Sequence, residues 1–89
     1  MKIDVYDSYA KTMDGRIMHF DVFVPSGSSA ESALQHGRDW LSSLGENPVG
    51  LEQSRCNFCH TETANPEVQR TVESSGFFIL QMEGCPAPV

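Results

Sequence analysis

The fold is decided by residues 2–24, KIDVYDSYAKTMDGRIMHFDVFV. Apolar and polar side chains alternate through residues 2–11 and again through residues 16–24, which is typical of half-buried β-strands. Asp14-Gly15 lies between the two stretches, and both residue types tolerate the positive φ of a type I′ turn. The stretch is therefore predicted to form an antiparallel β-hairpin.

The register of this hairpin decides which side chains enter the core, because a slip of one residue turns a strand over. With a two-residue loop, Tyr9 faces Phe20 on an apolar face that lies beneath a helix. Asp7 then falls on the same face, where a buried carboxylate needs hydrogen-bond partners. The other residues of the second strand on this face are Met18, Val22 and Val24.

The opposite face of the hairpin is predicted to be mostly polar. Four of its side chains are Tyr6, Ser8, His19 and Asp21. Two interpretations of this group stay open. The side chains form a polar pocket that holds a general base, or they form a solvated sheet face without a chemical role.

Two helices and two more strands are predicted to follow. Ser28 or Ser29 caps a helix whose apolar stripe ends at Gly45. Gly37 lies on the inner side of that helix and lets it approach the sheet closely. A third strand is predicted over residues 49–55.

The second helix is predicted over residues 66–75, because Asn65-Pro66-Glu67 is typical of a helix start and Gly76 of a helix end. The fourth strand covers residues 77–82.

The order β-β-α-β-α-β predicts an α/β (α+β) two-layer sandwich, with a four-stranded mixed sheet and two helices on one face. A strand–helix–strand connection favours a right-handed parallel crossover, so the third and fourth strands are expected to run parallel and to end at one edge of the sheet. Residues 1–85 are predicted to form a single domain, and residues 86–89 an irregular tail.

Composition limits the class of protein. The chain has 89 residues, 39% of them hydrophobic and 20% charged, which is globular composition. The net charge is -6 and the basic residues are scattered, so no nucleic-acid partner and no membrane partner is predicted. No signal peptide is recognised, so we expect a cytoplasmic protein with reduced cysteines. Binding of an unknown protein and self-association both stay open.

Three cysteines and a histidine form a constellation with metal-ligand character. Cys56, Cys59 and His60 follow the predicted third strand, and Cys85 follows the fourth. If those strands are parallel, all four residues reach one edge of the sheet. Two cysteines separated by two residues are a common zinc chelate, so zinc is the predicted cofactor. His60, His19 or water would complete the site.

The same residues fit three other interpretations. The stretch from Cys56 to His60 matches the attachment pattern of c-type haem, although that attachment occurs outside the cytoplasm. Cys56 and Cys59 also fit a redox dithiol beside a histidine. Finally, the cysteines fit small buried hydrophobic side chains with no chemistry.

Several motifs resemble those of a family of small uncharacterised bacterial proteins, one of the domain-of-unknown-function families. These motifs are Tyr6-Asp7-Ser8-Tyr9, Met18-His19-Phe20-Asp21-Val22-Phe23, Asp39-Trp40-Leu41, Cys56-Asn57-Phe58-Cys59-His60 and Met82-Glu83-Gly84-Cys85. The resemblance spans residues 2–85 and implies a compact cytosolic α/β fold. It implies no activity, so no catalytic residue is carried over.

The sequence therefore predicts an uncharacterised small cytosolic domain that binds zinc through a Cys/His cluster and acts by protein interaction. The alternative is a small thiol-redox enzyme that uses Cys56 and Cys59. Metal content separates the two, because a closed zinc site has unreactive thiols, whereas a redox dithiol is metal-free.

Overall fold

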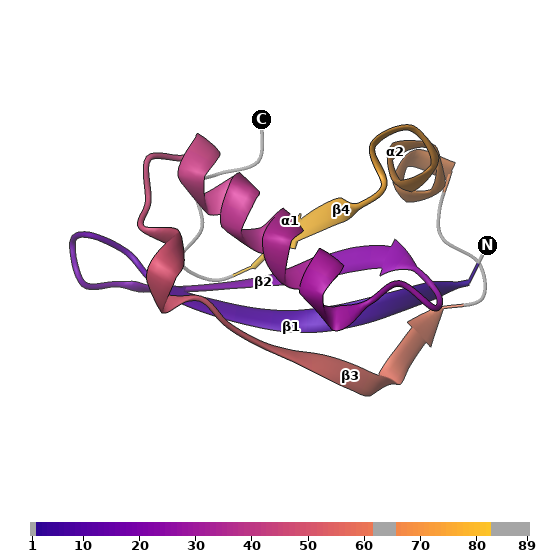
Figure 1. Cartoon of the computed structure of the whole chain (residues 1–89), viewed down its shortest axis with the longest axis horizontal. Helices are drawn as coiled ribbons and strands as arrows, with labels where there is room; N and C mark the ends of the chain where they lie inside the picture. The colour runs from indigo at the N-terminus through magenta and orange to yellow at the C-terminus, as the bar shows by residue number, and fades with distance from the viewer. Residues whose placement is uncertain (1, 62–65, 83–89) are drawn as a thin grey trace.

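The structure, a computed structural model, describes residues 2–61 and 66–82, with side chains described outside residues 55–61. It contains one open sheet of four strands in the order β3-β1-β2-β4, together with two α-helices (Figure 1). The elements are β1 (Ile3–Lys11), β2 (Ile17–Pro25), α1 (Ala30–Ser43), a short 3-10 helix η1 (Pro48–Gly50), β3 (Glu52–Thr61), α2 (Pro66–Ser75) and β4 (Phe78–Gln81). The predicted element order and the α+β class are confirmed.

The sheet is antiparallel throughout, not mixed. The β1–β2 hairpin occupies the centre, β3 pairs with β1, and β4 pairs with β2, each in antiparallel orientation. The prediction that β3 and β4 form a parallel crossover is therefore wrong. The crossover rule applies to parallel strands of one sheet, but here the chain crosses the whole hairpin between β3 and β4, and these strands form opposite edges.

The hairpin loop has one residue more than predicted, and this sets the register. The Thr12 amide donates to the Arg16 carbonyl at 2.7 Å, and the Gly15 amide donates to the Thr12 carbonyl at 3.1 Å. Gly15 has φ 90°, as in a three-residue loop that ends in a left-handed glycine. Tyr9 consequently pairs with His19 rather than with Phe20, so the predicted register is wrong by one residue.

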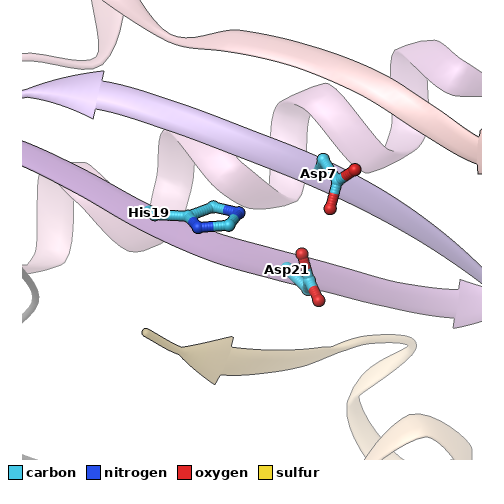
Figure 2. A group of neighbouring side chains, drawn as sticks. All are labelled: Asp7, His19 and Asp21. Carbon is cyan, nitrogen blue, oxygen red and sulfur yellow. The ribbon is translucent and has the colours of Figure 1, made fainter. Parts of the chain in front are cut away.

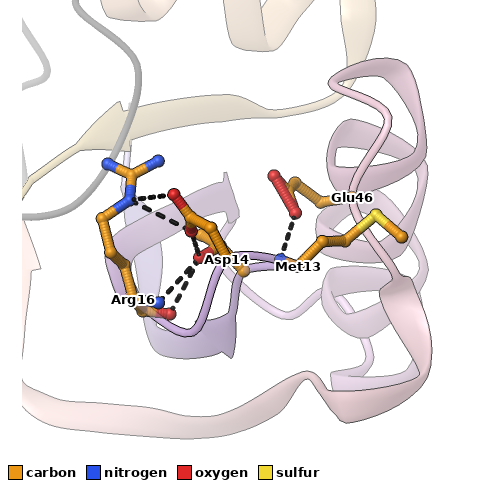
Figure 3. A network of polar contacts seen from close by, with 5 residues as sticks. Met13, Asp14, Arg16 and Glu46 are labelled. Carbon is orange, nitrogen blue, oxygen red and sulfur yellow. Dashed lines mark hydrogen bonds and ion pairs between the residues drawn. The ribbon is translucent and has the colours of Figure 1, made fainter.

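Hydrogen bonds hold the tip of the hairpin (Figure 3). Arg16 Nε donates to both carboxylate oxygens of Asp14, at 3.1 and 3.2 Å, and the Thr12 hydroxyl donates to Asp14 as well. The Met13 amide donates to Glu46 Oε1 at 2.9 Å, which ties the tip to the segment that follows α1. The three-residue loop is thus fixed both internally and by a contact from elsewhere in the chain.

The main core lies between α1 and one face of the sheet, called the inner face below. As predicted, Phe20 is buried beneath the helix, and its ring lies 4.6 Å from that of Trp40. Gly37 lets α1 approach closely, because a Cβ atom there would lie 2.9 Å from Leu51 Cδ2. The buried residues of this core are Tyr6, Ala10, Met18, Phe20, Val22, Val24, Ala33, Leu41 and Leu51.

The buried carboxylate of the inner face belongs to Asp4, not to Asp7. One Asp4 oxygen accepts a hydrogen bond from the Ser26 hydroxyl at 3.2 Å, and the other accepts from the Gly27 amide at 3.0 Å. The turn after β2 therefore supplies the donors that a buried carboxylate needs.

A second, smaller apolar cluster lies under α2. Val68 and Val72 of this helix pack with Ile3, Phe23 and Phe78. The strand register places these three strand residues on the face opposite α1, called the outer face below. This differs from the prediction of both helices on one face. Among the described residues, no helix is both long and apolar enough to cross a membrane.

Candidate functional site

A cluster of polar side chains lies on the outer face, in the middle of the central hairpin. Asp7 of β1 is directly opposite Asp21 of β2, and Tyr9 is opposite His19. Because residues two apart in a strand share a face, Asp7, His19 and Asp21 all project to the same side. Figure 2 shows the three side chains together on neighbouring strands, with α1 behind the sheet.

The three side chains are close enough to share one ion. One ligand atom from each of Asp7, His19 and Asp21 can be chosen so that all lie within 4.8 Å of one another. An ion with bonds of about 2.1 Å holds neighbouring tetrahedral ligands about 3.4 Å apart. The remaining gap of up to about 1.4 Å between ligand atoms is small enough for side-chain rotation to close.

Asp21 is the most constrained member of the cluster. Its side chain is 7% exposed, and its Oδ1 atom is buried with no hydrogen-bond partner among the described residues. Asp7 opposite cannot act as a donor while both carboxylates are ionised. A single proton or a single cation between the two groups would remove both the repulsion and the missing bond.

The environment raises the pKa of Asp21 from 3.8 to about 6. Burial is the largest cause, because it penalises the charged carboxylate. A hydrogen bond to Asp7, which requires the shared proton, and the negative charge of Asp7 add to the increase, whereas the charge of His19 opposes it. Near neutral pH, Asp21 is thus a carboxylate that a positive charge would stabilise.

The imidazole of His19 is oriented by an aromatic neighbour. The rings of Tyr9 and His19 stack with their centroids 4.4 Å apart and their planes 9° from parallel. Tyr9 itself remains partly exposed, so this side of the cluster borders solvent. The stack restricts the imidazole to a position beside the two carboxylates.

The structure separates the predicted polar pocket into two groups. His19 and Asp21 lie on the outer face, but Tyr6 and Ser8 are buried on the inner face. Ser8 Oγ donates to the Tyr6 carbonyl at 3.1 Å and accepts from Gln53 Nε2 at 3.0 Å, which gives it a structural role beneath α1. The one-residue error in register caused this misassignment.

The same error hid the third member of the cluster. The sequence analysis placed Asp7 on the inner face, yet the observed pairing puts it against Asp21. The sequence did contain a signal for this cluster. Each strand carries an aspartate and an aromatic ring two positions apart, Asp7 with Tyr9 in β1 and Asp21 with His19 in β2. Only the loop length distinguishes the two alignments.

The predicted cysteine site falls largely outside the described side chains. Cys56, Cys59 and His60 lie within β3, whose backbone continues to Thr61, and not in a turn after the strand. Their side chains, and the whole of Cys85, lie outside the described residues. Since β3 and β4 form opposite edges of the sheet, the topological reason for expecting the four residues to converge no longer holds.

Comparisons with known proteins agree with this fold. A sequence model described as "Domain of unknown function (DUF2024)" matches residues 1–82. The NMR structure of protein NE1680 from Nitrosomonas europaea, a structural genomics target, is similar to this chain with a TM-score of 0.71 and 37% sequence identity. The similarity covers 97% of this chain and 100% of that one. A search of curated proteins gave no match.

Proposed function

The chain belongs to the DUF2024 family, and we propose that it is a metal-binding domain that holds one zinc-class divalent ion through Asp7, His19 and Asp21. The resemblance to a family of unknown function seen in the sequence is confirmed, and that family carries no assigned activity to transfer. The proposal therefore rests on the site itself.

The observation that carries the proposal is the buried Asp21 oxygen that has no hydrogen-bond partner among the described residues and belongs to a carboxylate placed opposite Asp7. Opposed like charges destabilise a sheet, and a buried unpaired carboxylate costs several kcal/mol by an order-of-magnitude estimate. A divalent cation offsets both costs at once, because it is attracted to both carboxylates and binds their free lone pairs.

The donor set selects the class of ion. Carboxylates bind both hard and borderline cations, but an imidazole nitrogen favours zinc and neighbouring transition metals over magnesium and calcium. His19 should therefore discriminate between these groups. Three protein ligands also leave at least one coordination position for water or another ligand, as in open zinc sites.

The first prediction is that chelator-treated protein binds one equivalent of Zn²⁺ in a calorimetric titration. Asp21→Asn and His19→Gln should each weaken binding at least tenfold, because each removes one of the three ligands. Glu52→Gln is the matched control, since Glu52 is an exposed carboxylate on the same face, opposite Tyr9, and lies outside the set.

The same experiment must distinguish zinc binding at this site from zinc binding by the three cysteines. The variant with Cys56, Cys59 and Cys85 all changed to Ser should keep the zinc affinity of the parent protein. Replacing Zn²⁺ with Co²⁺ adds a spectroscopic check, because thiolate ligation produces a charge-transfer band that carboxylate and imidazole ligation lacks. Loss of binding in the cysteine variant, with binding retained in Asp21→Asn, would overturn the proposal.

The other predictions made from the sequence remain proposals. Zinc binding by Cys56, Cys59, His60 and Cys85 is tested by the same titration, and thiol redox activity by the alkylation rate of Cys56 and Cys59. A cytoplasmic location and action through a protein partner also remain proposals.

A further inference from the structure

Exposed apolar side chains surround the proposed metal site. On the outer face, four large hydrophobic residues are between 36% and 56% exposed. They are Tyr9, Ile17, Leu80 and Met82. We call them the apolar rim. Single exposed hydrophobic residues need no explanation, whereas a contiguous group of them is a candidate binding surface.

The strand register places each member of the apolar rim next to the cluster. Leu80 of β4 is directly opposite Asp21. The Met82 amide donates to the His19 carbonyl at 3.0 Å, so Met82 continues the same ladder beside His19. Ile17 precedes His19 by two residues and shares its face. The rim thus spans from β1 across β2 to β4.

We infer that the outer face binds a small apolar monocarboxylate, whose carboxylate coordinates the ion and whose hydrocarbon body lies on the apolar rim. This inference rests on the proposed function, because the head group needs the ion. Three protein ligands leave at least one coordination position on the ion, and the three side chains project from the face of the sheet opposite α1 (Figure 2).

Charge supports this class of ligand. The negative charges of Asp7 and Asp21 neutralise the charge of a divalent ion. One further anion can therefore coordinate the ion without facing an uncompensated negative charge. A ligand with a cationic head would compete with the ion for the same carboxylates. A second copy of the chain carries the same net charge of -6, and this like charge disfavours self-association.

The second prediction concerns a titration of zinc-loaded protein with acetate, hexanoate and 1-hexanol. Each fully buried methylene group contributes roughly fourfold in affinity. Half-coverage of the four extra methylenes makes hexanoate bind about fifteenfold more tightly than acetate. 1-Hexanol has the same tail without the anion, so it should bind more weakly than hexanoate. Metal-free protein should bind neither acid.

Variants of the apolar rim distinguish the contribution of the hydrocarbon tail to the affinity from that of the carboxylate head group. Leu80→Gln and Ile17→Gln should reduce the affinity for hexanoate toward that for acetate, while the affinity for Zn²⁺ stays unchanged. Val49→Gln is the control, because Val49 is an exposed apolar residue of η1 that does not belong to the apolar rim.

The outcomes distinguish this inference from the proposed function. If Zn²⁺ binds but hexanoate binds no more tightly than acetate, the ligand class is wrong and the metal site stands. If Zn²⁺ does not bind to Asp7, His19 and Asp21, the proposed function fails first. Equal binding of hexanoate by metal-free protein, or a dimer of the zinc-loaded protein that hexanoate does not dissociate, would also overturn the inference.

Discussion

Asp7 and Asp21 form the least favourable contact that a sheet can offer, a pair of acidic residues directly opposite each other on neighbouring strands. The buried Asp4 shows how the same chain satisfies a carboxylate when its role is structural, with a hydroxyl and an amide donor in place. Asp21 Oδ1 lacks such a donor among the described residues. This contrast between the two buried aspartates is the reason for proposing a ligand at Asp21.

The third prediction follows from the raised pKa of Asp21, which is about 6 in the folded protein against 3.8 ordinarily. Between these values the folded state holds a proton that the unfolded state has released, so protonation stabilises the fold. This contribution is fully present below about pH 3.8 and is lost as the pH rises through about 6. Metal-free protein should therefore lose stability, relative to Asp21→Asn, between pH 4 and pH 7.5.

Urea unfolding of the two proteins at several pH values measures this difference. Asp21→Asn should match the parent near pH 4 and exceed it in stability at pH 7.5, because asparagine imitates the neutral acid. Saturating Zn²⁺ at pH 7.5 should stabilise the parent protein and leave the variant nearly unchanged. A variant less stable than the metal-free parent at pH 7.5 would mean that the Asp21 charge already has a partner.

At the scale of elements, the hairpin loop determines which side chains form the site. The internal bonds of residues 12–16 define a three-residue loop, and Gly15 ends it with a left-handed backbone. One residue fewer would align Tyr9 with Phe20 and place Asp7 on the face of the main core. The chemistry of the outer face thus depends on a loop that contributes no residue to the site.

The fourth prediction tests that dependence. Gly15→Ala should destabilise the protein by about 1 kcal/mol, since a residue with a Cβ atom is strained at positive φ. Gly50→Ala is a close control, because neither glycine has a neighbour within 4 Å of a new Cβ atom, but only Gly15 has a positive φ. Denaturant unfolding measures both. Equal effects of the two changes would show that the loop backbone is not under this constraint.

At the scale of the whole molecule, the two faces of the sheet are stabilised unequally. α1 covers the inner face with an extensive apolar core, whereas α2 buries only Val68 and Val72 at one end of the outer face. Among the described residues, the polar cluster and the apolar rim also lie on the outer face. The larger of the two apolar cores therefore lies on the inner face, and the exposed apolar rim lies on the outer face.

The fifth prediction is that α2 opens before the central hairpin does. Native-state hydrogen exchange should show lower protection for the amides of α2 than for those of β1 and β2, because local opening of α2 exposes little apolar surface. Val72→Ala should speed exchange in α2 further and leave the hairpin amides nearly unchanged. A uniform loss of protection across all elements would indicate that the domain unfolds only as one unit.

The sequence by itself determined the elements and most of their ends, but not those of the third strand, which was predicted over residues 49–55 and is observed as Glu52–Thr61. The second helix was predicted over residues 66–75, as observed, because the cap, the proline and the terminal glycine act locally. The first two strands and the first helix agree within one or two residues for the same reason. Burial of Phe20 and the close approach at Gly37 were also predictable, since both follow from periodicity within one element.

Only the tertiary structure decided the register, the order of the strands and the face that α2 covers. Register depends on the length of a loop whose sequence, Thr12-Met13-Asp14-Gly15-Arg16, fits a two-residue turn as well as the observed three-residue turn. Strand order depends on which edge of the hairpin each later strand pairs with. The favoured edge depends on the burial of side chains summed over the whole chain. The group Asp7, His19 and Asp21 therefore emerges from pairing between strands, because no local pattern records which residues lie opposite one another.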